Sequence, residues 1–199
     1  MKHYIDITLL PSDDIGVHFL WSKVMMQVHL ALVEIQDSNR QVPVAVSFPN
    51  YKESVNKIPA FIGNKLRLLS VDKADLERLD IHKWLSRLAD YVHIKHIAEV
   101  PPTVLVYENF NRRRKSGSPD KHIRRRMKRH NETLEQASDY FKNYTMKAED
   151  RALPFIQMKS LESNNDFHLS IVRKEVEQGA KEVMFNTYGL NCDASLPKF

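Results

Sequence analysis

Two hydrophobic periodicities alternate along the first hundred residues, and their order is the feature that most limits the fold. Apolar residues at every second position predict strands, and apolar residues at every third or fourth position predict helices. The predicted elements are a strand at 3–11, a helix from 12–14 to about 35, strands at 42–48 and 66–71, a helix at 73–92 and a strand at 92–100. This β-α-β-β-α-β order is the ferredoxin-like arrangement.

The second half of the chain is less regular and predicts a separate domain. Strands are expected at 103–107, 155–159, 167–172 and 183–188, and helices at 119–130 and 133–144. The segment from Arg112 to Lys115 is expected in a linker before the first of these helices. Thr133 and Gln136 have the spacing of a capping box at the start of the second of these helices. We therefore expect an α+β protein: an N-terminal ferredoxin-like (βαββαβ, RRM-like) domain over residues 1–100, and a C-terminal α/β domain with an arginine-rich helix over residues 101–199.

Positive charge is concentrated in one segment. Residues 112–129 contain ten lysines and arginines and one acidic residue, Asp120, so this segment carries a formal charge of +9. The whole chain carries +5, so the remainder is mildly acidic, at −4. A basic segment on an acidic body predicts one anionic partner bound at one place. A disordered, solvated basic loop is the alternative explanation.

Helical spacing gathers the charges of residues 119–130. The residues expected on or beside one helix face are Lys121, Arg124, Arg125, Lys128 and Arg129. This face has no acidic residue to neutralise it, and guanidinium groups donate two parallel hydrogen bonds to a phosphate. The helix therefore predicts contacts with the backbone of a nucleic acid. Charge alone leaves RNA and DNA open, whereas the ferredoxin-like order and the short arginine-rich helix favour structured RNA.

The sequence offers no pattern for several other kinds of protein. No stretch approaches the roughly 20 apolar residues of a membrane span, and no signal region precedes the first strand. The lone Cys192 agrees with a cytoplasmic location, because one cysteine cannot form an internal disulfide. His93 and His96 fall on opposite sides of a strand, and His18 and His29 lie roughly 16 Å apart along a helix. We expect no membrane partner, no cofactor and no metal site.

Short motifs spread over almost the whole chain are similar to those of one family. They are His3-Tyr4-Ile5-Asp6-Ile7 with Pro11, Val28-His29, Ala31-Leu32-Val33, Val46-Ser47-Phe48-Pro49, Arg124-Arg125-Arg126-Met127-Lys128-Arg129-His130, Leu153-Pro154-Phe155, Ser160, Phe167 and Tyr188-Gly189-Leu190. In their joint order and spacing they resemble the CRISPR repeat-processing endoribonucleases of type I-F systems, the Csy group. The resemblance implies a hairpin RNA substrate that is cut at the 3′ base of its stem. It also implies that the protein keeps the mature crRNA and joins the other subunits of a surveillance complex.

The resemblance assigns catalytic roles to individual residues. His29 matches the family's catalytic histidine, and Ser160 matches the active-site serine. Tyr188 matches the tyrosine that supports the histidine. Phe167 matches an aromatic residue that stacks on a nucleotide at the foot of the stem.

The resemblance assigns RNA-binding roles to the arginines. Arg125 and Arg129 match helix arginines that grip the hairpin, and Arg112 matches an arginine that reads a base near the cleavage end. Arg114 departs from the pattern, because the family has glutamine at this position. Glutamine suits adenine and arginine suits guanine, so we expect Arg114 to read a guanine or a phosphate.

The implied chemistry requires no metal ion. The 2′-hydroxyl of RNA is itself a nucleophile once a base removes its proton. A neutral imidazole such as that of His29 can accept this proton, and the hydroxyl of Ser160 can hold the 2′-oxygen in position. The products would be a 2′,3′-cyclic phosphate and a 5′-hydroxyl.

Each of these residues also has an ordinary structural explanation. His29 could be a histidine at the boundary of the core, and the hydroxyl of Ser160 could bond to the backbone of a turn. Tyr188 could be a buried tyrosine, and Phe167 alternates with Leu169 as core residues do. For the whole protein, the alternatives are a non-catalytic protein that binds hairpin RNA and a basic regulator that binds DNA.

Overall fold

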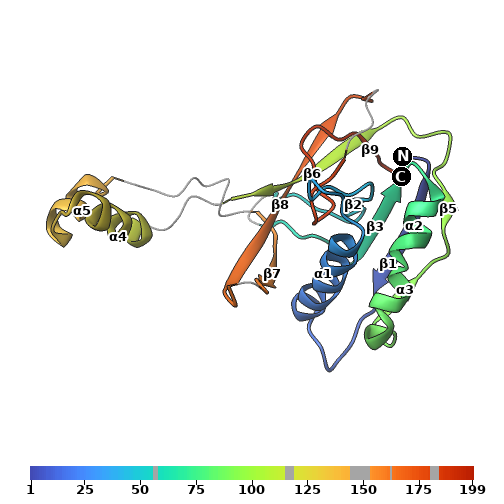
Figure 1. Cartoon of the computed structure of the whole chain (residues 1–199), viewed down its shortest axis with the longest axis horizontal. Coiled ribbons are helices and arrows are strands. Elements are labelled where there is room, and N and C mark those ends of the chain that lie inside the picture. Colours follow the sequence, from blue (N-terminus) through green and yellow to red (C-terminus); the bar gives the residue numbers. More distant parts are fainter. Residues whose placement is uncertain (56–57, 115–118, 144–152, 162, 180–183) are drawn as a thin grey trace.

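The fold consists of two antiparallel sheets with helices packed on them and a separate pair of helices (Figure 1). The computed structural model describes residues 1–55, 58–114, 119–143, 153–161, 163–179 and 184–199. Within these residues the strand pairings that form the sheets are antiparallel. The predicted α+β class is therefore confirmed.

The first sheet comes from the N-terminal half of the chain. Its strands are β1 (His3–Leu9), β2 (Ala45–Ser47), β3 (Lys65–Ser70), β4 (Val92–Ile94) and β5 (Ala98–Glu99). Their order across the sheet is β2-β3-β1-β4, and β5 also pairs with β1. Ile5, Ile7 and Leu9 are buried, as the alternation of β1 predicted.

Helix α1 (Val17–Glu34) packs against β1 and also against β7 of the second sheet. Its apolar stripe is buried: Leu20, Trp21, Val24, Met25, Val28, Ala31 and Leu32. The Trp21 indole N–H donates to the carbonyl oxygen of Gly63 at 2.8 Å, which fixes the first turns of the helix. The prediction that α1 begins at 12–14 is wrong. The Ser12 hydroxyl accepts hydrogen bonds from the N–H groups of Asp14 and Ile15, so these residues form a turn before the helix.

The second sheet comes from the C-terminal half. Its strands are β6 (Tyr107–Arg113), β7 (Phe155–Lys159), β8 (Asp166–Val176) and β9 (Leu196–Pro197), in the order β7-β8-β6-β9. Phe110 of β6 makes edge-to-face contacts with Phe48 and Tyr51, at centroid distances of 5.3 and 5.9 Å. The Tyr51 hydroxyl donates to the carbonyl oxygen of Ile171 at 3.1 Å. The two sheets therefore share one hydrophobic core.

The basic helix α4 (Pro119–His130) has the bounds that the sequence predicted, and it packs on α5 (Leu134–Tyr140). The pair lies apart from the two sheets (Figure 1). The predicted capping box at Thr133 and Gln136 is confirmed. Arg126 donates to both carboxylate oxygens of Glu132, at 2.7 and 2.8 Å, and its guanidinium lies 3.7 Å from the Tyr140 ring centroid. Arg126 therefore joins α4 to α5.

Several predicted elements of the first sheet differ in extent. The predicted helix 73–92 is divided into α2 (Lys73–Leu79), α3 (Ile81–Trp84) and a 3-10 turn, η1 (Ser86–Leu88). Asp80 has a φ of +43°, a left-handed conformation that ends α2. The predicted strand 92–100 is two short strands, β4 and β5. The predicted strand 42–48 is reduced to β2 and an isolated bridge from Val42 to Phe185.

Two predicted strands of the second half are wrong. No strand occupies 103–106, and β6 runs from Tyr107 to Arg113, so Arg112 and Arg113 lie on a strand rather than in a linker. The predicted strand 183–188 begins outside the described residues, and from Asn186 onward the backbone forms a turn. The predicted strands 155–159 and 167–172 are confirmed within β7 and β8. The predicted helix 133–144 ends at Tyr140, and Tyr144 lies outside the described residues.

Candidate active site

His29 lies on α1, at the edge of the buried stripe, and is half-buried. Its Nδ1 atom is 2.7 Å from the backbone carbonyl oxygen of Thr187. A carbonyl oxygen only accepts hydrogen bonds, so Nδ1 carries the proton and donates it. In a neutral imidazole this leaves Nε2 with a lone pair. The geometry therefore prepares Nε2 to accept a proton from another group.

Tyr188 stacks on the imidazole of His29. The two ring centroids are 4.3 Å apart and the rings are tilted by 7°. The ring of Phe167 in β8 lies edge-to-face with that of Tyr188, at a centroid distance of 6.5 Å. The guanidinium of Arg112 lies 5.0 Å from the centroid of Phe167 and 5.7 Å from that of Tyr188. Four residues that the sequence singled out therefore form one cluster, drawn from α1, β6, β8 and a turn.

The turn at residues 186–190 holds Tyr188 in place. The side-chain oxygen of Asn186 accepts hydrogen bonds from the N–H groups of Tyr188 (2.8 Å) and Leu190 (3.3 Å). Gly189 has a φ of +72°, and its carbonyl oxygen accepts from the N–H of Val46 at 2.8 Å. A Cβ at position 189 would collide with the Val46 side chain and lie 2.8 Å from its backbone nitrogen. Only glycine fits this turn against β2 without strain.

The phenol of Tyr188 is neutral at physiological pH. Burial raises the pKa of Tyr188 above its usual value, and the nearby positive charge of Arg112 opposes this only in part. The observed contacts of Tyr188 with His29, Phe167 and Arg112 are made by the ring. Tyr188 therefore presents its ring rather than its hydroxyl to the imidazole of His29.

Ser160 directly follows β7 and is half-buried. Its N–H donates to the carbonyl oxygen of Asn165 at 2.9 Å, and its hydroxyl accepts from the N–H of Ser163 at 3.2 Å. Met158 pairs with Phe167 in the β7–β8 register, and alternation places Ser160 on the same face of the hairpin as both residues. Lys159 lies on the opposite face, as the alternation of the strand requires. The hairpin thus brings Ser160 to the side of the sheet that carries the aromatic cluster.

The arginine helix divides its residues between two faces. The five predicted phosphate ligands, Lys121, Arg124, Arg125, Lys128 and Arg129, are all exposed. The half-buried positions of α4 are His122, Ile123, Arg126 and Met127. This division leaves a continuous cationic face toward solvent, because the other face packs on α5. Arg112 and Arg114, at and just beyond the end of β6, are also exposed.

The chain matches one known protein family over almost its whole length. The model of a family described as CRISPR-associated protein (Cas_Csy4) matches residues 4–199. The chain belongs to the Csy4 family. The CRISPR-associated endonuclease Cas6/Csy4 of Pseudomonas aeruginosa (strain UCBPP-PA14) is 32% identical to it over 201 residues, 100% of both chains. The enzyme of the same name from Escherichia coli (strain UTI89 / UPEC) is 30% identical over 200 residues, again 100% of both. The resemblance drawn from the sequence motifs, to the type I-F Csy group, is confirmed.

The sequence did not reveal how this Csy4-family chain orients its histidine. Thr187 contributes its backbone carbonyl, and every residue has such a group, so the residue type gave no indication of this role. Asn186 and Gly189 have the spacing that is typical of a turn, with asparagine first and glycine three positions later. The predicted strand 183–188 includes Asn186 and Tyr188 instead. A predicted turn would have placed Tyr188 at its tip rather than between paired strands.

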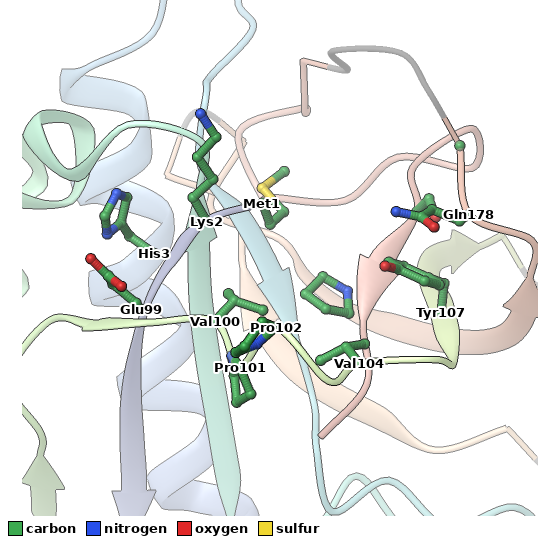
Figure 2. A pocket seen from close by; sticks show the side chains of 13 residues that line it. Met1, Lys2, His3, Glu99, Val100, Pro101, Pro102, Val104, Tyr107 and Gln178 are labelled. Carbon is green, nitrogen blue, oxygen red and sulfur yellow. The ribbon is translucent and has the colours of Figure 1, made fainter.

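In the part of the chain that the structure describes, no three His, Cys, Asp or Glu side chains gather as metal ligands would. None of the helices in these residues is long and apolar enough to span a membrane. A pocket of about 460 Å³ lies at the start of β1 and contains none of the predicted site residues. Figure 2 shows Lys2, His3 and Glu99 on one side of it and Tyr107 with Gln178 on the other.

Proposed function

We propose that this chain is a metal-independent endoribonuclease that cleaves CRISPR precursor RNA at the 3′ base of the repeat hairpin. Membership of the Csy4 family and the endonuclease names of its relatives support this proposal. The observation that carries it is the 2.7 Å contact between His29 Nδ1 and the Thr187 carbonyl oxygen. That contact fixes the tautomer that a general base requires.

The proposed reaction uses the nucleophile of the substrate. Nε2 of His29 takes the proton of the 2′-hydroxyl, and the 2′-oxygen forms a bond to the adjacent phosphorus. The bond from phosphorus to the 5′-oxygen breaks, and this oxygen takes a proton from solvent. The products are a 2′,3′-cyclic phosphate and a 5′-hydroxyl. Ser160 can hold the 2′-oxygen in position, because a hydroxyl that accepts one hydrogen bond can still donate another to the 2′-oxygen.

The aromatic cluster binds the foot of the hairpin stem, and the arginine helix binds the stem itself. Phe167 offers a ring on which the nucleotide at the foot of the stem stacks, and Arg112 beside it reads a base. Arg114 reads a guanine or a phosphate. The cationic face of α4 grips the stem by its phosphates, so the product hairpin stays bound after cleavage. The protein then serves as a subunit of a type I-F crRNA-guided surveillance complex, with cytoplasmic location.

We also propose that residues 1–100 form a ferredoxin-like domain and that residues 101–199 form the domain that binds the hairpin. The strand order β2-β3-β1-β4 in the antiparallel first sheet supports the first assignment. The exposed cationic face of α4, which lies within residues 101–199, supports the second.

One observation favours the alternative of a non-catalytic hairpin-binding protein. The hydroxyl of Ser160 stabilises its own turn through the N–H of Ser163, a structural use that needs no substrate. The alternative and the proposal agree on binding and differ on cleavage.

The deciding experiment uses a repeat hairpin from the CRISPR array that neighbours the gene. The RNA is incubated with the protein in EDTA, as all-ribose RNA and with a single 2′-deoxy substitution at the scissile nucleotide. Cleavage of the all-ribose RNA alone, leaving a cyclic phosphate, is the expected result. Binding without cleavage would establish the alternative, and equal cleavage of both RNAs would exclude attack by the 2′-hydroxyl.

A further inference from the structure

A groove of about 770 Å³ lies between the first turns of α1, the segment 59–62 and β7. Three phenylalanines line it and remain exposed: Phe19 by 56%, Phe61 by 37% and Phe155 by 40%. Exposed rings that converge on one groove are poorly explained by core packing, since water surrounds much of each. The groove contains none of the residues assigned above to catalysis or to the hairpin.

The groove adjoins the candidate active site along two elements. On β7, Met158 lines the groove, and its side chain lies on the same face of the hairpin as Ser160 and Phe167. Lys159 and Asp166 line the groove from the opposite face. On α1, Ser22 lines the groove two turns before His29, at a spacing that keeps both on one helix face about 10 Å apart. A chain that passes the imidazole can therefore continue into the groove.

The lining matches single-stranded RNA in chemistry. Phenylalanine rings stack on bases of any sequence, and lysines attract the phosphates between them. Lys23 and Lys159 lie in the lining, with the Lys23 ammonium 4.9 Å from the Phe19 ring centroid. The rings and the lysines together form the combination of stacking surfaces and positive charge that single strands require.

β7, the edge strand of the second sheet, also offers backbone hydrogen-bonding groups to the groove. The N–H of Ser160 bonds to Asn165, and that of Ile171 bonds to Pro154. In an antiparallel ladder the intervening residues turn their N–H and C=O groups the other way. The backbone groups of Gln157 and Lys159 therefore point away from β8, along the free edge that lines the groove.

We propose that this groove binds the single-stranded RNA immediately 3′ of the scissile phosphate. The inference rests on the proposed function, because a precursor cut at the base of a hairpin must continue beyond the cut. The arginine helix holds the stem on one side of the scissile bond, and the groove holds the outgoing strand on the other. After cleavage only the groove contacts secure the downstream fragment, so it leaves while the hairpin stays.

The test compares two uncleavable hairpins that carry a 2′-deoxy scissile nucleotide. One ends one nucleotide beyond the cleavage position, and the other continues for about eight more. We expect the longer RNA to bind at least about fivefold tighter, as one stacked base would suffice to give. The double variant Phe19→Ala/Lys23→Gln should lose this gain and keep the affinity for the short hairpin. The double variant Leu105→Ala/Lys83→Gln, on surface outside the groove, should retain the gain.

A second measurement does not depend on the variants. A 4-thiouridine at the second downstream nucleotide should crosslink to the peptides that contain Phe19, Phe61 or Phe155. Crosslinks confined to other peptides would overturn the inference. Equal affinity for both RNAs would also overturn the inference. The groove would then bind something other than RNA, such as a peptide strand. Failure to bind or cut even the short all-ribose hairpin would instead overturn the proposed function, and this inference with it.

Discussion

The Nδ1 atom of His29 lies 2.7 Å from the carbonyl oxygen of Thr187, a residue 158 positions away in the sequence. The contact joins helix α1 to the turn at residues 186–190. Because this turn also carries Tyr188, one short segment both fixes the tautomer of the imidazole and covers one of its faces. Nε2, the atom that we propose as the base, is thereby separated from the atoms that hold the ring.

The tautomer of His29 is directly observable. In long-range proton–nitrogen NMR spectra, the neutral imidazole of His29 should show a protonated Nδ1 and an unprotonated Nε2, with the signals assigned by comparison with His29→Ala. This state is expected because Thr187 offers only an acceptor. Observation of the Nε2–H tautomer would mean that the contact with Thr187 is not a hydrogen bond in solution.

The ring of Tyr188 matters more than its hydroxyl. Tyr188→Phe keeps the stacked surface, so we expect a single-turnover cleavage rate within about threefold of the wild type. Tyr188→Ala removes a stacked pair worth about 0.5–1.5 kcal/mol, so we expect a loss of up to roughly tenfold. The comparison is made with the same hairpin RNA at saturating protein.

The pKa of Tyr188 gives this prediction a second readout. Burial raises that pKa, so the folded protein holds the phenol proton more tightly than the unfolded chain does. Protonated Tyr188 therefore contributes to the free energy of unfolding fully below the ordinary pKa of tyrosine. This contribution is lost as pH rises through the raised pKa of Tyr188. Below that range the rate–pH profiles of wild type and Tyr188→Phe should have the same shape. A difference in shape near neutral pH would show that the hydroxyl takes part in catalysis.

Gly189 is required by the turn that carries Tyr188. Gly189→Ala places a Cβ against Val46 at a φ of +72°, so the turn must move. We expect the free energy of unfolding to fall by at least about 1 kcal/mol and cleavage to slow with it. The matched control is Gly16→Ala, where nothing lies within 4 Å of the new Cβ. Chemical denaturation of both variants measures the difference, and equal stability would contradict the assigned role of the turn.

The cationic face of α4 should set the salt dependence of binding. Arg125→Ala and Arg129→Ala each remove an exposed guanidinium, so each should weaken hairpin binding by about tenfold at low salt. Each should also reduce the slope of log affinity against log salt by roughly one. Affinity is measured with uncleavable hairpin RNA over a range of salt concentrations.

Arg87→Ala is the matched control for these variants. Arg87 is also an exposed arginine, on the 3-10 turn η1, and its removal should leave both affinity and slope unchanged. If Arg87→Ala and Arg125→Ala weakened binding alike, α4 would be only one part of a diffuse positive surface.

The sequence predicted the parts of this fold that depend on local patterns. The bounds of α4, the bounds of β7 and the cap at Thr133 follow from helical spacing, alternation and the capping box. The division of α4 was predictable for the same reason. The exposed residues Lys121, Arg124, Arg125, Lys128 and Arg129 are the five that helical spacing had gathered.

The sequence could not predict what depends on contacts between distant segments. Arg112 and Arg113 were expected in a linker, and only pairing with β8 makes them part of a strand. Asp80 interrupts a regular apolar pattern through its backbone conformation, which the pattern does not encode. The site residues themselves were found by resemblance to a family. Their assembly around the carbonyl of Thr187 became visible only in three dimensions.

The central claim is that the imidazole of His29 supplies the base. The most direct measurement is the single-turnover cleavage rate of His29→Ala with and without added imidazole. We predict a loss of at least about 10²-fold, unchanged hairpin affinity, and a rate that rises with the concentration of free imidazole base. Cleavage by His29→Ala at the wild-type rate would contradict the claim.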